Sequence, residues 1–66
     1  MSVAKVTEII ASSTTSFEDA INQGISRATK TLKNVTGAWV KEQKIMINND
    51  KVSEYRVNMK VTFILK

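Results

Sequence analysis

The fold is decided by residues 52–66, which read Val52-Ser53-Glu54-Tyr55-Arg56-Val57-Asn58-Met59-Lys60-Val61-Thr62-Phe63-Ile64-Leu65-Lys66. From Tyr55 onward, apolar or aromatic side chains occupy every second position and polar side chains lie between them, with Ile64 as the exception. Successive side chains of a strand point to opposite faces, so this alternation predicts a strand with one buried and one polar face. At about 3.3 Å per residue the strand reaches roughly 45 Å. Its apolar face needs a cover.

The cover is predicted to be a helix that runs from Phe17 to about Asn34. Its apolar stripe has helical spacing and consists of Phe17, Ala20, Ile21, Gly24, Ile25, Ala28 and Leu32. Ser16 is a candidate N-cap, and Asp19 is expected to complete a capping-box-like pair with it. Gly24 lies in the middle of the stripe, where a missing side chain lets the helix approach the sheet closely.

Two further strands are expected, over residues 2–10 and from Ala38 to about Ile47, with a polar connection over residues 11–15. The element order is therefore β-α-β-β, in the α+β class. Residues 48–51 have the composition of a hairpin turn.

The hairpin register follows if Asn48 lies opposite Lys51. Val40 then falls opposite Met59 and Ala38 opposite Val61, which matches apolar side chains with apolar ones. In the same register Trp39 falls opposite Lys60, and Gln43 opposite Arg56, on the polar face.

The length and composition of the chain limit how it can be stabilised. Its 66 residues make one expected domain, residues 1–66, without Cys or His. A chain this short buries a marginal core and usually needs a disulfide, a metal or oligomerisation, so the sequence favours oligomerisation. The net charge of +4 fits either an anionic partner or a mixed-charge surface. No membrane span or secretory signal is apparent, and the cytoplasm is the expected location.

Enzymatic activity is not expected. A Ser–His or Cys–His nucleophile needs residues that the chain lacks. The six carboxylates are scattered, and no glycine-rich phosphate loop is present. Asn48, Asn49 and Asp50 carry oxygen ligands of the kind that calcium prefers, but three such residues at a hairpin more often form only a turn, and no metal site is predicted.

Trp39 is the most informative single residue. An indole on the polar face beside Lys60 is able to stack on a flat ring while nearby cations hold an anionic group. Trp is also enriched at subunit interfaces, so an interface role stays open.

Several stretches together resemble dodecins, which are small flavin-binding proteins. The stretches are KVTEII (residues 5–10) with the Ser/Thr-rich loop after it, SFEDAI (16–21), RATKTL (27–32), EQ (42–43) and YRVNMKVTF (55–63). The resemblance covers essentially the whole chain without a gap. It implies a three-stranded antiparallel sheet wrapped around one helix, with the last strand in the centre, and assembly into a hollow homododecamer.

The resemblance also implies a flavin site, with two departures. Aligned on Glu42-Gln43, the family's ring-stacking Trp falls at Gly37, and its flavin-contacting Gln falls at Arg56. The chain thus resembles a branch that lacks both residues. Trp39, two positions after Gly37, is either a displaced stacking platform or a plug. The predicted ligand-binding set is Trp39, Arg56, Gly37, Gln43 and Lys60.

The leading hypothesis is a non-enzymatic homododecamer that sequesters a small molecule, by family a flavin such as FMN or riboflavin, which makes it a flavoprotein. The alternative is an assembly of the same fold that has lost flavin binding and acts as an ion-binding or structural protein. A basic nucleic-acid-binding module is a third hypothesis, which rests on charge and a strand face and lacks an aromatic ladder.

Overall fold

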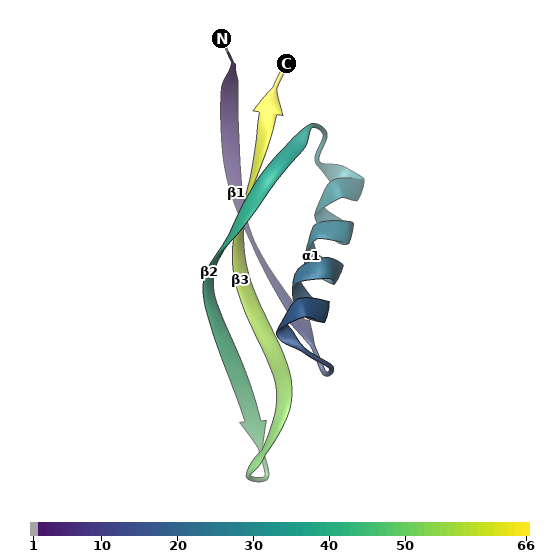
Figure 1. Cartoon of the computed structure of the whole chain (residues 1–66), viewed down its shortest axis with the longest axis vertical. Coiled ribbons are helices and arrows are strands. Elements are labelled where there is room, and N and C mark those ends of the chain that lie inside the picture. The colour runs from purple at the N-terminus through teal and green to yellow at the C-terminus, as the bar shows by residue number, and fades with distance from the viewer. Residues whose placement is uncertain (1) are drawn as a thin grey trace.

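The computed structural model describes residues 2–66, and it has the β-α-β-β order expected from the sequence (Figure 1). The elements are β1 (Val3–Ser13), α1 (Phe17–Thr31), β2 (Val35–Asn48) and β3 (Lys51–Leu65). The strands form one antiparallel sheet in the order β1-β3-β2. The closing strand is therefore central, as the resemblance implied.

The apolar face of β3 forms the core. Val57, Met59 and Val61 are at most 1% exposed, and Val57 and Met59 form one cluster with Ala20 of α1. Phe17 closes one end of this core by an edge-on contact with Tyr55, with the ring centroids 5.1 Å apart. The alternation of residues 52–66 is thus confirmed as a strand with one buried face.

Gly24 sets the distance between α1 and the sheet. A Cβ atom at this position would lie 2.6 Å from Met59 Cε and 3.0 Å from Ala11 Cβ. Both distances are shorter than ordinary van der Waals contact, so no side chain fits without displacement. The close approach expected from the sequence is confirmed.

The start of α1 is capped by Ser16, whose Oγ accepts a hydrogen bond of 3.0 Å from the backbone N–H of Asp19. The second predicted contact of the capping box, from the Asp19 side chain back to the Ser16 backbone N–H, is wrong. The Asp19 carboxylate instead accepts hydrogen bonds from Ser13 Oγ at 2.6 Å and from Gln23 Nε2 at 2.5 Å. Ser13 Oγ also accepts the backbone N–H of Thr15 at 2.9 Å, so this buried hydroxyl links β1 to the helix start.

Removing the Ser13 hydroxyl should destabilise the protein. We expect Ser13→Ala to lower the free energy of unfolding by about 1–3 kcal/mol, since it leaves a backbone N–H and a carboxylate without their partner. Ser12→Ala is the matched control, because Ser12 is exposed on the neighbouring position. Urea unfolding at a fixed protein concentration measures both, and equal stabilities of the two variants would refute this role.

Three element boundaries differ from the expected ones. The connection predicted at residues 11–15 is wrong for its first three residues, because β1 continues pairing with β3 as far as Ser13 opposite Tyr55. The helix ends at Thr31 rather than near Asn34, which has a left-handed backbone with φ of 64°. The second strand starts at Val35 rather than Ala38, so Gly37 lies within β2.

The hairpin register is confirmed at its two ends and wrong in the middle. Asn48 opposes Lys51 across a turn in which Asn49 and Asp50 both have positive φ, and Trp39 opposes Lys60. Irregularities between Val40 and Glu42, and between Met46 and Ile47, shift the pairing between them by one residue.

Gln43 is the predicted site residue that this shift displaces. It opposes Val57 rather than Arg56, so it lies on the helix-facing side of the sheet and not on the polar face. Arg56 opposes Lys44 instead. The physical reason is the bulge at Lys41, because one extra residue moves every following side chain to the other face.

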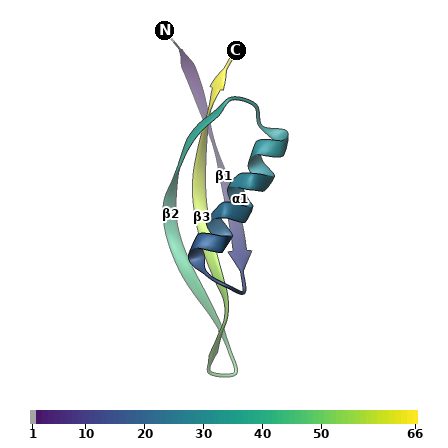
Figure 2. The same ribbon diagram turned by 45° about the vertical axis from the view of Figure 1, so that its right-hand side comes forward.

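The helix covers only part of the sheet. The molecule measures 51 × 19 × 14 Å, and the β2–β3 hairpin extends well beyond the helix start (Figures 1 and 2). Ile45 of β2 lies opposite Tyr55 on the helix-facing side yet is 47% exposed, and Ile47 further along the hairpin is 69% exposed. The protomer therefore leaves apolar side chains of its own core layer uncovered.

Candidate functional site

The sheet has a face turned away from α1, here called the open face. Because the odd-numbered side chains of β3 pack toward the helix, Arg56, Asn58 and Lys60 point to the opposite side. The strand registers add neighbours from both edge strands. The open face thus includes Glu8, Ile10 and Ser12 of β1, Arg56, Asn58 and Lys60 of β3, and Trp39, Glu42 and Lys44 of β2.

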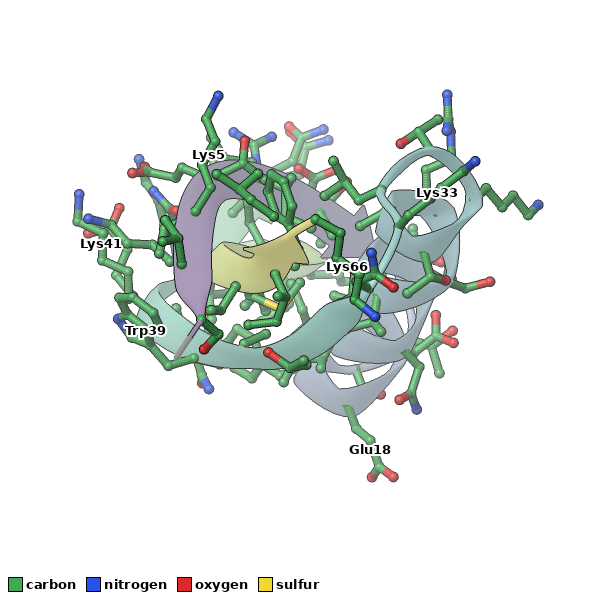
Figure 3. All side chains as sticks on the ribbon, turned by 90° about the horizontal axis from the view of Figure 1, so that it is seen from above. Lys5, Glu18, Lys33, Trp39, Lys41 and Lys66 are labelled. Carbon is green, nitrogen blue, oxygen red and sulfur yellow. The ribbon has the colours of Figure 1, made fainter. Side chains whose placement is uncertain are left out.

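Trp39 and Lys60 lie together on this face, as predicted. Glu8, Lys60 and Trp39 occupy one row across the three strands. Trp39 is 50% exposed and extends, with Lys41, from the side of the molecule away from α1 (Figure 3). A half-exposed indole next to an ammonium group is able to stack on a planar ring that carries negative charge.

Glu8 organises the polar side chains beside Trp39. Its Oε2 accepts a hydrogen bond of 2.8 Å from Asn58 Nδ2, and its Oε1 lies 3.7 Å from Lys41 Nζ. The hydrogen bond from Asn58 is the largest cause that lowers the pKa of Glu8, and Lys41 and Lys60 lower it further, against a smaller opposing effect of desolvation. Glu8 is therefore a carboxylate at neutral pH.

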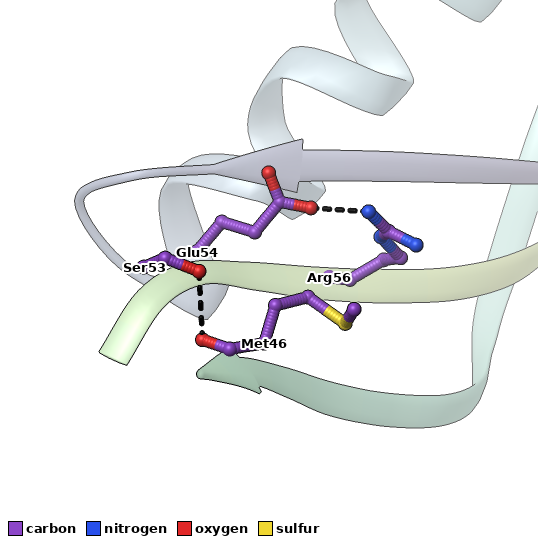
Figure 4. Close-up of polar contacts among 4 residues, drawn as sticks. All are labelled: Met46, Ser53, Glu54 and Arg56. Atoms are coloured by element: carbon purple, nitrogen blue, oxygen red, sulfur yellow. Dashed lines mark hydrogen bonds and ion pairs between the residues drawn. The ribbon is translucent and has the colours of Figure 1, made fainter. Parts of the chain in front are cut away.

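Arg56 lies further along the open face. It is four positions away from Lys60, which is roughly 13 Å along a strand. Its guanidinium forms an ion pair with Glu54 of the same strand, near the hairpin end where Ser53 Oγ donates to the Met46 carbonyl (Figure 4). Together with Lys44, Asn58 and other open-face residues, Arg56 lines a small cavity of about 120 Å³. It is thus not adjacent to Trp39.

Gly37 borders a second hollow. A groove of about 450 Å³ lies between α1 and the first half of β2 and is lined mainly by apolar residues, among them Ile21, Ile25 and Val40. No atom lies within 4 Å of the position where a Gly37 Cβ would stand. Trp39 also lines this groove. The predicted site residues therefore fall into four places: Trp39 with Lys60, Gly37 at the groove, Arg56 further along the open face, and Gln43 on the other face.

Glu8, Lys41 and Asn58 were not predicted as neighbours of Trp39. The alternation of β3 did place Asn58 on the same face as Lys60, which was a usable signal. The pairing of β1 with β3, which brings Glu8 opposite Lys60, had no local signal. Within residues 2–66, no group of three or more acidic side chains suited to a metal ion is found, and no helix there is long and apolar enough to cross a membrane.

Comparison with known proteins identifies the family. The Dodecin family model matches residues 3–66, and the chain belongs to this family. The chain is 33% identical over 66 residues to the calcium dodecin of Mycobacterium tuberculosis, and the match covers 100% of this chain and 93% of that protein.

Solved structures agree with this assignment. The dodecin from Streptomyces davaonensis superposes with a TM-score of 0.93 at 34% identity and covers 98% of this chain and 96% of its own. A protein from Thermus thermophilus gives a TM-score of 0.93 at 35% identity and covers 100% and 97% of the two chains. Dodecins are small binding proteins that assemble into dodecamers, and the calcium dodecin of Mycobacterium tuberculosis is described as having a calcium-binding site (TM-score 0.85, 31% identity, 97% and 91% covered).

Proposed function

We propose that this protein is a non-enzymatic homododecamer that binds and sequesters a small molecule with a planar ring on the open face of its sheet. The observation that carries the proposal is Trp39, a half-exposed indole next to Lys60 on a protomer with uncovered apolar surface. Flavin is the ligand class that the family suggests. The expected cytoplasmic location stays a prediction.

The site differs in chemistry from a site built on Trp at position 37 and Gln at position 56. Gly37 offers no ring, so any stacking falls to Trp39 on the same strand. Arg56 donates hydrogen bonds and accepts none, so it favours carboxylates, phosphates or ring carbonyls. Gln43 lies on the helix-facing side and is left out of the proposed open-face site.

A fluorescence titration tests the flavin proposal. Riboflavin or FMN is added to the protein, and flavin fluorescence is recorded. Stacking of the flavin ring on Trp39 should quench this fluorescence, and the quenching should saturate at roughly half a ligand or more per chain. Trp39→Ala should abolish the quenching, whereas Trp39→Phe keeps an aromatic face and serves as the matched control. Unchanged fluorescence at about tens of micromolar protein would contradict the proposal.

The alternative function is an ion-binding or structural dodecamer without flavin. It is supported by the similarity to a protein named calcium dodecin. Calorimetric titration with Ca²⁺ separates the two functions: saturable calcium binding together with no flavin quenching would favour the alternative. The nucleic-acid hypothesis has only the net charge of +4 in its support.

A further inference from the structure

A polar cluster of four side chains, Glu8, Lys41, Asn58 and Lys60, lies beside Trp39 and draws on all three strands. Lys41 starts on β2 and its Nζ reaches Glu8 on β1, so its side chain crosses over the central strand β3. Asn58 approaches the same carboxylate from β3. A ring stacked on Trp39 and lying over β3 therefore meets this cluster.

Glu8 fixes the arrangement of the cluster. Because Glu8 is ionised, Asn58 must present its N–H₂ group to it rather than its carbonyl. The other amide atom, Asn58 Oδ1, is buried and has no hydrogen-bond partner among residues 2–66. Leaving a buried acceptor unpaired costs free energy. The contact with Glu8 therefore fixes the orientation of the Asn58 amide, although it leaves Oδ1 without a partner.

The charges of the open face do not cancel around Trp39. The basic groups are Lys41, Lys44, Arg56 and Lys60, and the acidic groups are Glu8, Glu42 and Glu54. Arg56 pairs with Glu54, and Glu42 and Lys44 line the same small cavity. The four basic groups exceed the three acidic groups by one, so the open face carries one excess positive charge. Glu8 is bordered by Lys41 and Lys60, and Lys60 lies next to the indole.

We propose that Glu8 sets the charge preference of the Trp39 site, so that the site selects a planar aromatic monoanion over a neutral ring of the same shape. Glu8 acts as a positioning residue that holds Lys41 over the sheet, on a face that keeps a surplus of one positive charge. The inference rests on the proposed function in taking the open face as a ligand site, but it does not require that the ligand is a flavin.

The local charge is measurable without a ligand, because Trp39 is the only tryptophan. Its fluorescence is quenched by iodide, caesium and acrylamide, which are an anionic, a cationic and a neutral probe. We expect iodide to quench more strongly than caesium. Glu8→Gln should increase the iodide-to-caesium ratio, and Lys60→Gln should reduce it, by about twofold each at low ionic strength. Ser12→Asn on the same face is the control.

The ligand class is tested with 2-naphthoate and 2-naphthamide, which share a ring system and differ in charge. Calorimetry should show naphthoate binding about threefold more tightly than the amide, a difference that widens in Glu8→Gln and disappears in Lys60→Gln. Equal quenching by iodide and caesium, a Trp39 that no probe reaches, or equal affinities for the two compounds would each overturn the inference. Flavin quenching in the titration above would still stand if the two ions or the two compounds behaved equally, so this failure is distinguishable from failure of the proposed function. An indole that no probe reaches would contradict both.

Discussion

Replacing Gly24 by valine should destabilise the protein more than any surface substitution. The first atom of the new side chain already falls 2.6 Å from Met59 Cε and 3.0 Å from Ala11 Cβ. The end of the Met59 side chain is flexible, but Ala11 is part of β1, so the helix itself has to move away from the sheet. We expect the free energy of unfolding to fall by roughly 1–3 kcal/mol, even after the better helix propensity of valine.

Gly37→Val is the matched control for this substitution. A Cβ atom at Gly37 meets nothing within 4 Å, its φ is not positive, and valine is favoured in strands. Urea unfolding followed by circular dichroism at one fixed protein concentration compares the two variants, since assembly makes stability depend on concentration. A Gly24→Val protein as stable as Gly37→Val would show that α1 does not pack at this distance.

Replacing Ile45 by glutamate should abolish assembly while leaving the protomer folded. Ile45 lies on the helix-facing side of β2 but is 47% exposed, because α1 does not reach it. Its substitution costs the isolated protomer little. In an assembly that covers this surface it would bury an unpaired carboxylate, which is strongly unfavourable.

Light scattering measures the result. We expect the mass to fall from that of a dodecamer, about 89 kDa, toward the 7.4 kDa of one chain. Asn22→Glu adds the same charge at an exposed position of α1 and should keep the large mass. If Ile45→Glu still assembles like Asn22→Glu, the uncovered part of β2 is not a subunit contact.

The fold was predictable because its main elements have strong local patterns. The alternation of residues 52–66 identified β3, and Ser16, Gly24 and the apolar stripe identified α1. The strand ends were less predictable, because β1 continues to Ser13 only through pairing with a strand far away in the sequence. The role of Asp19 was missed because its partner Ser13 was predicted to lie in the polar connection, whereas it is the last residue of β1.

The candidate site was only partly predictable. Trp39 and Lys60 were paired correctly because the apolar matches at Val40 and Ala38 fixed that end of the hairpin. Gln43 was placed wrongly because nothing in the sequence around Lys41 signals a bulge. Glu8 was missed because its place beside Lys60 depends on the register between β1 and β3, for which the sequence holds no local signal.

The mass of the unmodified protein in solution is the most direct test of the proposal that one chain is an incomplete unit. Sedimentation equilibrium at about micromolar concentration should give roughly 89 kDa, since twelve chains of 7.4 kDa would cover each other's exposed β2 surface. A mass of one or two chains would contradict the proposal, because the apolar side chains of β2 would then remain in water.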